Sequence, residues 1–169
     1  SRIKKLNPNA KIIFCGCATE RNPKAFSEKS KDYLVLGSFS KQKILEFLDK
    51  NGQMLFPEPK EFEELLSVTS LRTRTYVKVQ DGCNNFCSYC IIPYLRGRSR
   101  SRNPESVLNE INSVNAKEVV INGINLSAYD FNGTNLTGLI KALKTVDCRI
   151  RLGSLEVGVI DDQFLQALK

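Results

Sequence analysis

The sequence has no histidine and no long apolar run, and each absence excludes a class of function. Without histidine, Ser-His-Asp and Cys-His catalysis, histidine-ligated zinc and a histidine pH switch are excluded. The longest clearly apolar run, residues 12–18, is far shorter than the roughly 20 residues that cross a bilayer, so no membrane partner is expected. The basic N-terminal residues precede no apolar stretch, so no signal peptide is expected either.

Glycine and proline are scarce as well, with 10 and 6 among 169 residues, whereas 41% of the residues are hydrophobic. This composition is typical of a folded globular chain rather than a disordered one. The six cysteines do not indicate a disulfide scaffold, because a chain of this length can build a core without cross-links and nothing suggests export. A reducing cytoplasm, with thiolates available to bind a metal, is the expected location.

The net charge of +7 is concentrated in residues 71–102, where Asp81 is the single acidic residue. Clustered guanidinium groups attract phosphates, so nucleic acid is a candidate partner. A solvated basic face and charges that neutralise an anionic cofactor are the alternatives. Because a guanidinium can bind a phosphate through two hydrogen bonds, we single out four RNA-binding candidates: Arg96, Arg98, Arg100 and Arg102. Pairing of one of them with a cofactor carboxylate is a further alternative.

Strand and helix signals alternate along the chain. Apolar runs predict strands over residues 11–15, 33–36, 75–80, 118–121 and 148–155. Capping residues, among them Ser40, and apolar stripes predict helices that begin near residues 22, 40, 103, 136 and 161. This alternation indicates an α/β fold with parallel strands. Residues 51–70 interrupt it with a Pro-rich stretch, followed by one short helix around Phe62, Leu65 and Leu66, and we interpret them as a linker.

Residues 71–169 form three β–loop–α units in this interpretation. In such folds, sites form in the loops that follow the C-terminal ends of the strands. The cysteine-bearing loop after residue 80, the turn at 122–125 and the turn at 154–158 all follow predicted strands. These three segments are therefore expected at one rim.

The cysteine loop contains Cys83, Cys87 and Cys90 in a C-x₃-C-x₂-C array. Thiolates are soft ligands that suit zinc or an iron–sulfur cluster. A structural zinc site needs four ligands and usually shows two C-x₂-C pairs, whereas only one tight trio is present here. Three thiolates on a 4Fe–4S cluster leave one iron open to a small molecule. The array favours a cluster over zinc, and uncoordinated buried cysteines remain the third possibility.

This array, with Tyr89 just before the last cysteine, resembles the signature of radical S-adenosylmethionine enzymes. The wider string at 82–94, with 96–98 and 101–102, is similar to the methylthiotransferases. Strings at 122–126 and 151–156 resemble the branch that acts on threonylcarbamoyladenosine in tRNA. Residues 16–18 and the following Pro23 are similar to the end of that family's N-terminal domain.

The resemblance implies a domain organisation. Residues 1–50 are expected to be the C-terminal part of a flavodoxin-like N-terminal domain, and 51–70 the linker. Residues 71–169 are expected to be the first three βα units of a partial radical-SAM (β/α) barrel. The family's N-terminal domain holds a second cluster on three cysteines, of which only Cys17 has a match here. The chain is therefore expected to be an internal fragment that is inactive alone.

The resemblance also implies the chemistry and the partners. The cofactors are a 4Fe–4S cluster, with two in the intact enzyme, and S-adenosylmethionine, whose reductive cleavage yields a 5′-deoxyadenosyl radical. The radical removes a hydrogen from the adenine ring of the modified nucleoside, where sulfur and then a methyl group are added. The partners are tRNA, S-adenosylmethionine and an electron donor such as flavodoxin or ferredoxin. No general acid or base is needed, which suits a chain without histidine.

The resemblance assigns roles to particular residues. Cys83, Cys87, Cys90 and Cys17 are the expected metal ligands, and a buried thiol at the end of a strand is the alternative for Cys17. Cys15 lacks a match to the motif and is expected in the core, and Cys148, beside a predicted strand, is expected to be structural. The expected cofactor-binding residues lie beside the last cysteine and in the two later turns: Tyr89, Asn122, Gly123, Asn125, Ser154 and Glu156. An ordinary polar turn is the alternative for Asn122, Gly123 and Asn125, and a side chain that faces solvent is the alternative for Glu156.

Three functions remain open from the sequence. The first is the tRNA methylthiotransferase. The second is another radical enzyme, such as the methylthiotransferase that modifies an aspartate of a ribosomal protein. The third is a non-catalytic zinc module that binds nucleic acid. The basic segment after the cysteines favours RNA as a partner, and therefore favours the first function over the second.

Overall fold

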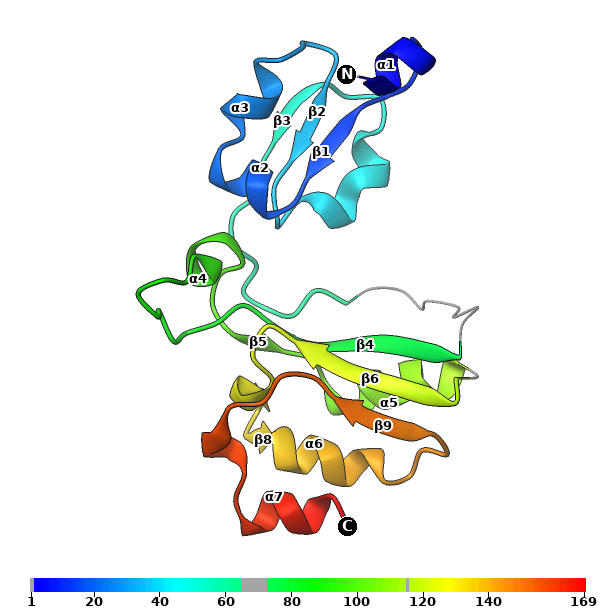
Figure 1. The fold of residues 1–169 in the computed structure, drawn as a ribbon, viewed down its shortest axis with the longest axis vertical. Helices are drawn as coiled ribbons and strands as arrows, with labels where there is room; N and C mark the ends of the chain where they lie inside the picture. The colour runs from blue at the N-terminus through cyan, green and yellow to red at the C-terminus, as the bar shows by residue number, and fades with distance from the viewer. Residues whose placement is uncertain (1, 65–72, 115) are drawn as a thin grey trace. The chain divides into compact units, whose positions relative to one another are not determined.

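The computed structural model describes residues 2–64, 73–114 and 116–169. The chain divides into two compact units, one of residues 1–58 with 94–96 and one of residues 59–93 with 97–169 (Figure 1). Each unit is described separately below.

The first unit is built on a three-stranded parallel sheet. Strands β1 (Ile13–Cys15), β2 (Leu34–Leu36) and β3 (Gly52–Met54) lie in the order β1-β2-β3. The central strand is fully buried and carries three aliphatic side chains in succession, as expected for a strand that is covered on both faces. The helices are α1 (Arg2–Leu6), α2 (Cys17–Arg21), α3 (Lys24–Ser27) and the 3₁₀ helix η1 (Lys41–Phe47). The predicted parallel pairing of the first two strands is confirmed.

Two expectations for this region, a cap at Ser40 and a linker over residues 51–70, are corrected, and a third, the short helix around Phe62, is corrected in part. Ser40 does not cap the following helix through its side chain, because its hydroxyl oxygen accepts a hydrogen bond from the Gly37 amide at 2.7 Å. Strand β3 occupies part of the expected linker and pairs with β2. In the same segment Phe62 lies outside any helix, and Leu65 and Leu66 fall outside the described residues.

The second unit contains a four-stranded sheet in the order β5-β4-β6-β9. Strands β4 (Arg74–Asp81), β6 (Glu118–Gly123) and β9 (Arg149–Leu152) are parallel, and the short β5 (Arg100–Ser101) is antiparallel to β4. The remaining elements are α4 (Ile92–Leu95), α5 (Pro104–Ser113), η2 (Leu126–Ala128), β7 (Asp130–Phe131), β8 (Thr134–Asn135), α6 (Leu136–Leu143), η3 (Val157–Val159) and α7 (Asp162–Ala167). Three β–loop–α units are thus present, as predicted, and the curved sheet fits part of a radical-SAM barrel.

Helices α5 and α7 of this unit begin at the capping residues that the sequence predicts. The Asn103 side chain accepts a hydrogen bond from the Glu105 amide at 2.9 Å, and proline follows as the first residue of α5. The Asp161 carboxylate accepts one from the Phe164 amide at 2.7 Å at the start of α7. Each cap satisfies a backbone N–H that has no partner within the helix.

Helices α5, α6 and α7 share one core with a single face of the sheet. Alternate residues of β6 and β9 enter it, including Val119, Ile121 and Ile150, because successive strand side chains point to opposite faces. Tyr76 and Arg151 lie on the opposite face and are exposed. The core therefore lies on the helical side, and the strand ends carry the loops that form the site (Figure 1).

This core gives a stability prediction. Leu139 in α6 is fully buried, so we expect Leu139→Ala to lower the free energy of unfolding by about 3 kcal/mol through lost transfer energy and a new cavity. Leu165 in α7 is 47% exposed, and Leu165→Ala is the matched control with an expected change below about 0.5 kcal/mol. Urea unfolding of the intact protein measures both. Equal losses would show that α6 does not pack as described.

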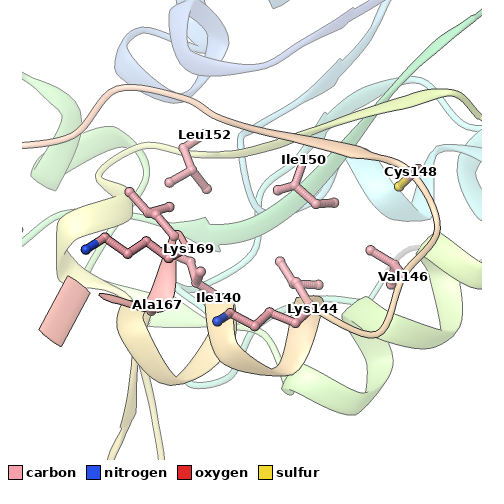
Figure 2. Close-up of a pocket in the computed structure, with 10 residues that line it drawn as sticks. Ile140, Lys144, Val146, Cys148, Ile150, Leu152, Ala167 and Lys169 are labelled. Carbon is pink, nitrogen blue, oxygen red and sulfur yellow. The ribbon is translucent and has the colours of Figure 1, made fainter. Parts of the chain in front are cut away.

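A hollow of about 440 Å³ lies on the helical side of β9 and contains no predicted ligand or cofactor residue. Figure 2 shows Ile150 and Leu152 above Ile140 of α6, with the aliphatic stems and amines of Lys144 and Lys169 beside them. Cys148 lines the same hollow, and burial raises the pKa of its thiol. Seven of the ten residues that line the hollow are aliphatic, which favours packing over catalysis. Among the described residues, no helix is long and apolar enough to cross a membrane.

Candidate active site

The cysteine loop leaves the end of β4 through a tight turn at Gly82, whose φ of 72° is left-handed. A side chain at this position is not accommodated, because a Cβ atom on Gly82 would lie 1.8 Å from the carbonyl oxygen of Arg98. The Cys83 amide then donates to the Gly97 carbonyl at 3.0 Å, and this bond ties the start of the loop to its return. Further along, the Cys90 amide donates to the Cys87 carbonyl at 2.9 Å. Backbone contacts thus give the loop a defined shape.

The three cysteines of this loop line one cavity of about 260 Å³. Cys83 is buried, Cys90 is half-buried and Cys87 is exposed. The loops after β6 and β9 contribute to the same cavity, which brings together most of the residues expected at the site: Tyr89, Asn125, Ser154 and Glu156. The C-terminal ends of three parallel strands therefore meet at one site, as in other α/β folds.

A carboxylate joins the three loops. Oε1 of Glu156 accepts hydrogen bonds from the side-chain amides of Asn85 at 2.7 Å and Asn125 at 2.8 Å. The Glu156 backbone amide donates to the Ser127 hydroxyl at 2.8 Å, which fixes the carboxylate against the loop after β6. Sequence reasoning missed Asn85, because its partner lies 71 positions later and leaves no local signal.

Two expected cofactor residues are placed outside the cavity lining. Asn122 pairs with Lys78, and Gly123 pairs with Gln80. A Cβ atom on Gly123 would lie 2.9 Å from Cβ of Gln80, so the missing side chain allows a close approach between β6 and β4. The structure thus gives Gly123 a packing role beside the site.

Tyr89 is 89% exposed, in agreement with its position on the loop surface. The negative charge of the Cys87 sulfur raises the pKa of the Tyr89 phenol, and a hydrogen bond to the same sulfur acts in the same direction. Tyr89 lines the same cavity as the three cysteines.

The donor set consists of three cysteine side chains around one cavity. Among the described residues, no three cysteine or carboxylate side chains converge closely enough to hold one metal ion. A closed zinc site needs four converging ligands, and the described part of the chain does not provide it. A 4Fe–4S cluster takes each thiolate on a different iron, so its ligands surround a volume instead of one point. Three thiolates around a shared cavity fit this requirement.

The other cysteines occupy different environments. Cys17 begins α2, and its sulfur accepts a hydrogen bond from the Ser38 hydroxyl at 3.7 Å. Cys15 ends β1 and is exposed, which corrects the expectation that it lies in the core. Cys148 packs against the core of the second unit, in agreement with a structural role. The role of Cys17 as a ligand stays a prediction.

The four arginines singled out for RNA differ in exposure. Arg98 is exposed and lies 4.4 Å from the centre of the Phe86 ring, and Arg96 is half-buried. Arg100 and Arg102 are only 7% and 6% exposed. Arg102 binds Glu64 at 2.6 Å and also Glu110, and Arg100 lies 3.9 Å from Asp81. Burial in ion pairs favours a structural role for these two over contact with phosphates.

Comparisons with known proteins agree with this geometry. The family model described as the Radical SAM superfamily matches residues 77–168, more than half of the chain. A threonylcarbamoyladenosine tRNA methylthiotransferase MtaB from Chlamydia pneumoniae is 37% identical over 99% of the chain and 39% of its own length. MtaB from Bacillus subtilis is 33% identical over 99% of the chain and 41% of its length.

A third relative carries a different name. The tRNA-2-methylthio-N(6)-dimethylallyladenosine synthase of Clostridioides difficile is 31% identical over 99% of the chain and 39% of its own length. The chain thus spans about two fifths of the curated relatives that it matches.

Proposed function

Since this chain belongs to the Radical SAM superfamily, we propose that it is part of a tRNA methylthiotransferase that modifies threonylcarbamoyladenosine. The observation that carries the proposal is the cavity that joins the three cysteines to the loops after β6 and β9. The names of the relatives support the substrate, and the resemblance of the strings at 122–126 and 151–156 supports the same branch.

In this proposal Cys83, Cys87 and Cys90 hold a 4Fe–4S cluster beside a binding site for S-adenosylmethionine. When bound, the cluster and S-adenosylmethionine supply the radical chemistry. The chain binds and orients them. Asn125 and Ser154 offer polar groups at the cavity wall, and the Glu156 carboxylate attracts an amino group or accepts a hydrogen bond from a ribose hydroxyl. The amides of Asn85 and Asn125 hold that carboxylate in place.

The proposal assigns the rest of the chain as well. Residues 1–58, which include β3, belong to the end of a flavodoxin-like domain, and residues 71–169 belong to the first half of the radical-SAM barrel, with residues 59–70 connecting the two. Cys17 serves a second cluster in the intact enzyme. A flavodoxin or ferredoxin in the cytoplasm supplies electrons, and tRNA is the macromolecular partner.

Arg98 is the arginine best placed to contact RNA, because it is exposed beside the cysteine loop. We expect Arg98→Ala to weaken tRNA binding by the intact protein and to lower the slope of log affinity against log salt by about one, as loss of one phosphate contact requires. Arg21→Ala, a change of an exposed arginine in α2, is the control. Filter binding at several salt concentrations measures both. An unchanged slope for Arg98→Ala would remove this arginine from the RNA interface.

Nucleoside analysis of tRNA tests the proposed function. A strain that lacks the gene is expected to retain threonylcarbamoyladenosine but lose its methylthio form, and the intact protein should restore it. Loss of the methylthio group from dimethylallyladenosine instead would assign the chain to the activity in the Clostridioides difficile relative's name. Unchanged tRNA together with an unmodified ribosomal-protein aspartate would favour the protein-modifying enzyme.

A further inference from the structure

Gln80 is a fully buried polar residue near the end of β4. The pairing of β4 with β6 shifts register between Lys78 and Gln80, so the strand carries one extra residue there. Such irregularities redirect side chains and are common beside active sites. A buried amide needs hydrogen-bond partners for both its oxygen and its nitrogen. The partners of Gln80 connect two of the loops that form the cavity.

The amide nitrogen of Gln80 holds the base of the cysteine loop. Nε2 donates to the carbonyl oxygens of Gly82 at 2.8 Å and Asp81 at 3.0 Å, and to the Ser99 hydroxyl at 2.9 Å. The Ser99 amide in turn donates to the Asn84 side chain at 3.1 Å. The departure and the return of the cysteine loop are therefore attached to the same side chain.

The amide oxygen of Gln80 holds the loop after β6. Oε1 accepts a hydrogen bond from the Asn125 backbone amide at 2.8 Å, and the Asn125 side chain binds Glu156. The carboxamide satisfies both ends, because carbonyl oxygens need a donor and the Asn125 amide needs an acceptor. A carboxylate would leave the carbonyls without a donor, and an apolar side chain would satisfy neither end.

We propose that Gln80 is a positioning residue that fixes the cluster-binding loop relative to the Asn125 turn, and so sets the geometry in which cluster and S-adenosylmethionine meet. The assignment of cluster and cofactor rests on the proposed function. The coupling of the two loops rests on the hydrogen bonds alone.

The experiment compares Gln80→Met with Val77→Ala in the intact protein. Methionine has nearly the volume of glutamine but makes none of the four hydrogen bonds. Val77 is buried in the same strand and contacts the helical core, so Val77→Ala reports general destabilisation. Hydrogen exchange before reconstitution follows the amides of residues 82–84 and 124–127. After anaerobic reconstitution, electron paramagnetic resonance of the reduced cluster measures the affinity for S-adenosylmethionine.

We expect Gln80→Met to speed exchange in both segments together and to weaken S-adenosylmethionine binding about tenfold, while Val77→Ala changes thermal stability without either effect. If Gln80→Met does not fold, Ser99→Ala removes the hydroxyl that accepts a hydrogen bond from Gln80, and exchange should shift in the same direction. Unchanged exchange and affinity in the folded variant would overturn the positioning role. A wild-type protein that takes up no cluster would instead contradict the proposed function, and the exchange measurement would still test the coupling.

Discussion

Cys87→Ala is expected to abolish binding of the cluster at the cysteine loop, with loss of about half of the iron of an intact enzyme that holds two clusters, and to reduce cleavage of S-adenosylmethionine to background. Cys87 lies between the other two cysteines of the loop and lines the same cavity, so its loss removes one of three thiolates from a site that has no histidine to replace it. Iron and sulfide content after anaerobic reconstitution, with 5′-deoxyadenosine release, measures the effect.

Cys148→Ala is the matched control, since it removes a thiol of the same unit from a packing position. It should retain the iron content and the cleavage of the wild type. Full iron content and continued cleavage in Cys87→Ala would refute its assignment as a ligand. Equal losses in both variants would point to a general effect of thiol removal on folding.

Gly82→Ala is expected to give the second largest effect, a loss of about 2–5 kcal/mol in unfolding free energy and most of the cluster loading. The left-handed backbone penalises alanine by about 1–2 kcal/mol. The new Cβ also collides with the Arg98 carbonyl, which cannot move away by a change of side-chain rotamer. The cysteine loop must therefore shift as a whole.

Gly133→Ala separates the effect of the left-handed backbone from the effect of the steric collision. Gly133 has a φ of 84°, but its Cβ would meet nothing within 4 Å, so this variant carries the backbone penalty without the collision. We expect it to lose about 1–2 kcal/mol and to load a normal amount of iron. Urea unfolding and iron analysis of the intact proteins measure both quantities. Similar results for the two glycines would contradict the close contact at Gly82.

Local chemistry made several elements predictable from the sequence. Asn103 and Asp161 each satisfy a backbone amide two or three residues away, so the starts of α5 and α7 can be recognised without knowledge of the fold. The alternation of strands and helices likewise predicts parallel pairing, because a connection that contains a helix returns the chain in the same direction. The three cysteines were found for the same reason, since their spacing lies within one loop.

Contacts between distant residues were not predictable. Gln80 binds the Asn125 amide 45 positions later, and Asn85 binds Glu156 across a still longer separation. The burial of Arg102 depends on Glu110 and Glu64, so the charge of the segment alone could not distinguish a structural arginine from an exposed one. The exposure of Cys15 was missed because an apolar run predicts a strand but does not show which of its residues other parts of the chain bury.

Strand β9 is the last in the sheet order among the described residues, and its sequence alternates two arginines with two aliphatic residues. Ile150 and Leu152 pack against the core, whereas Arg149 and Arg151 are exposed. Arg151 lies 3.5 Å from the Glu118 carboxylate of the neighbouring β6, on the face of the sheet away from the helices. Part of the arginine charge on this face is therefore balanced within the sheet itself.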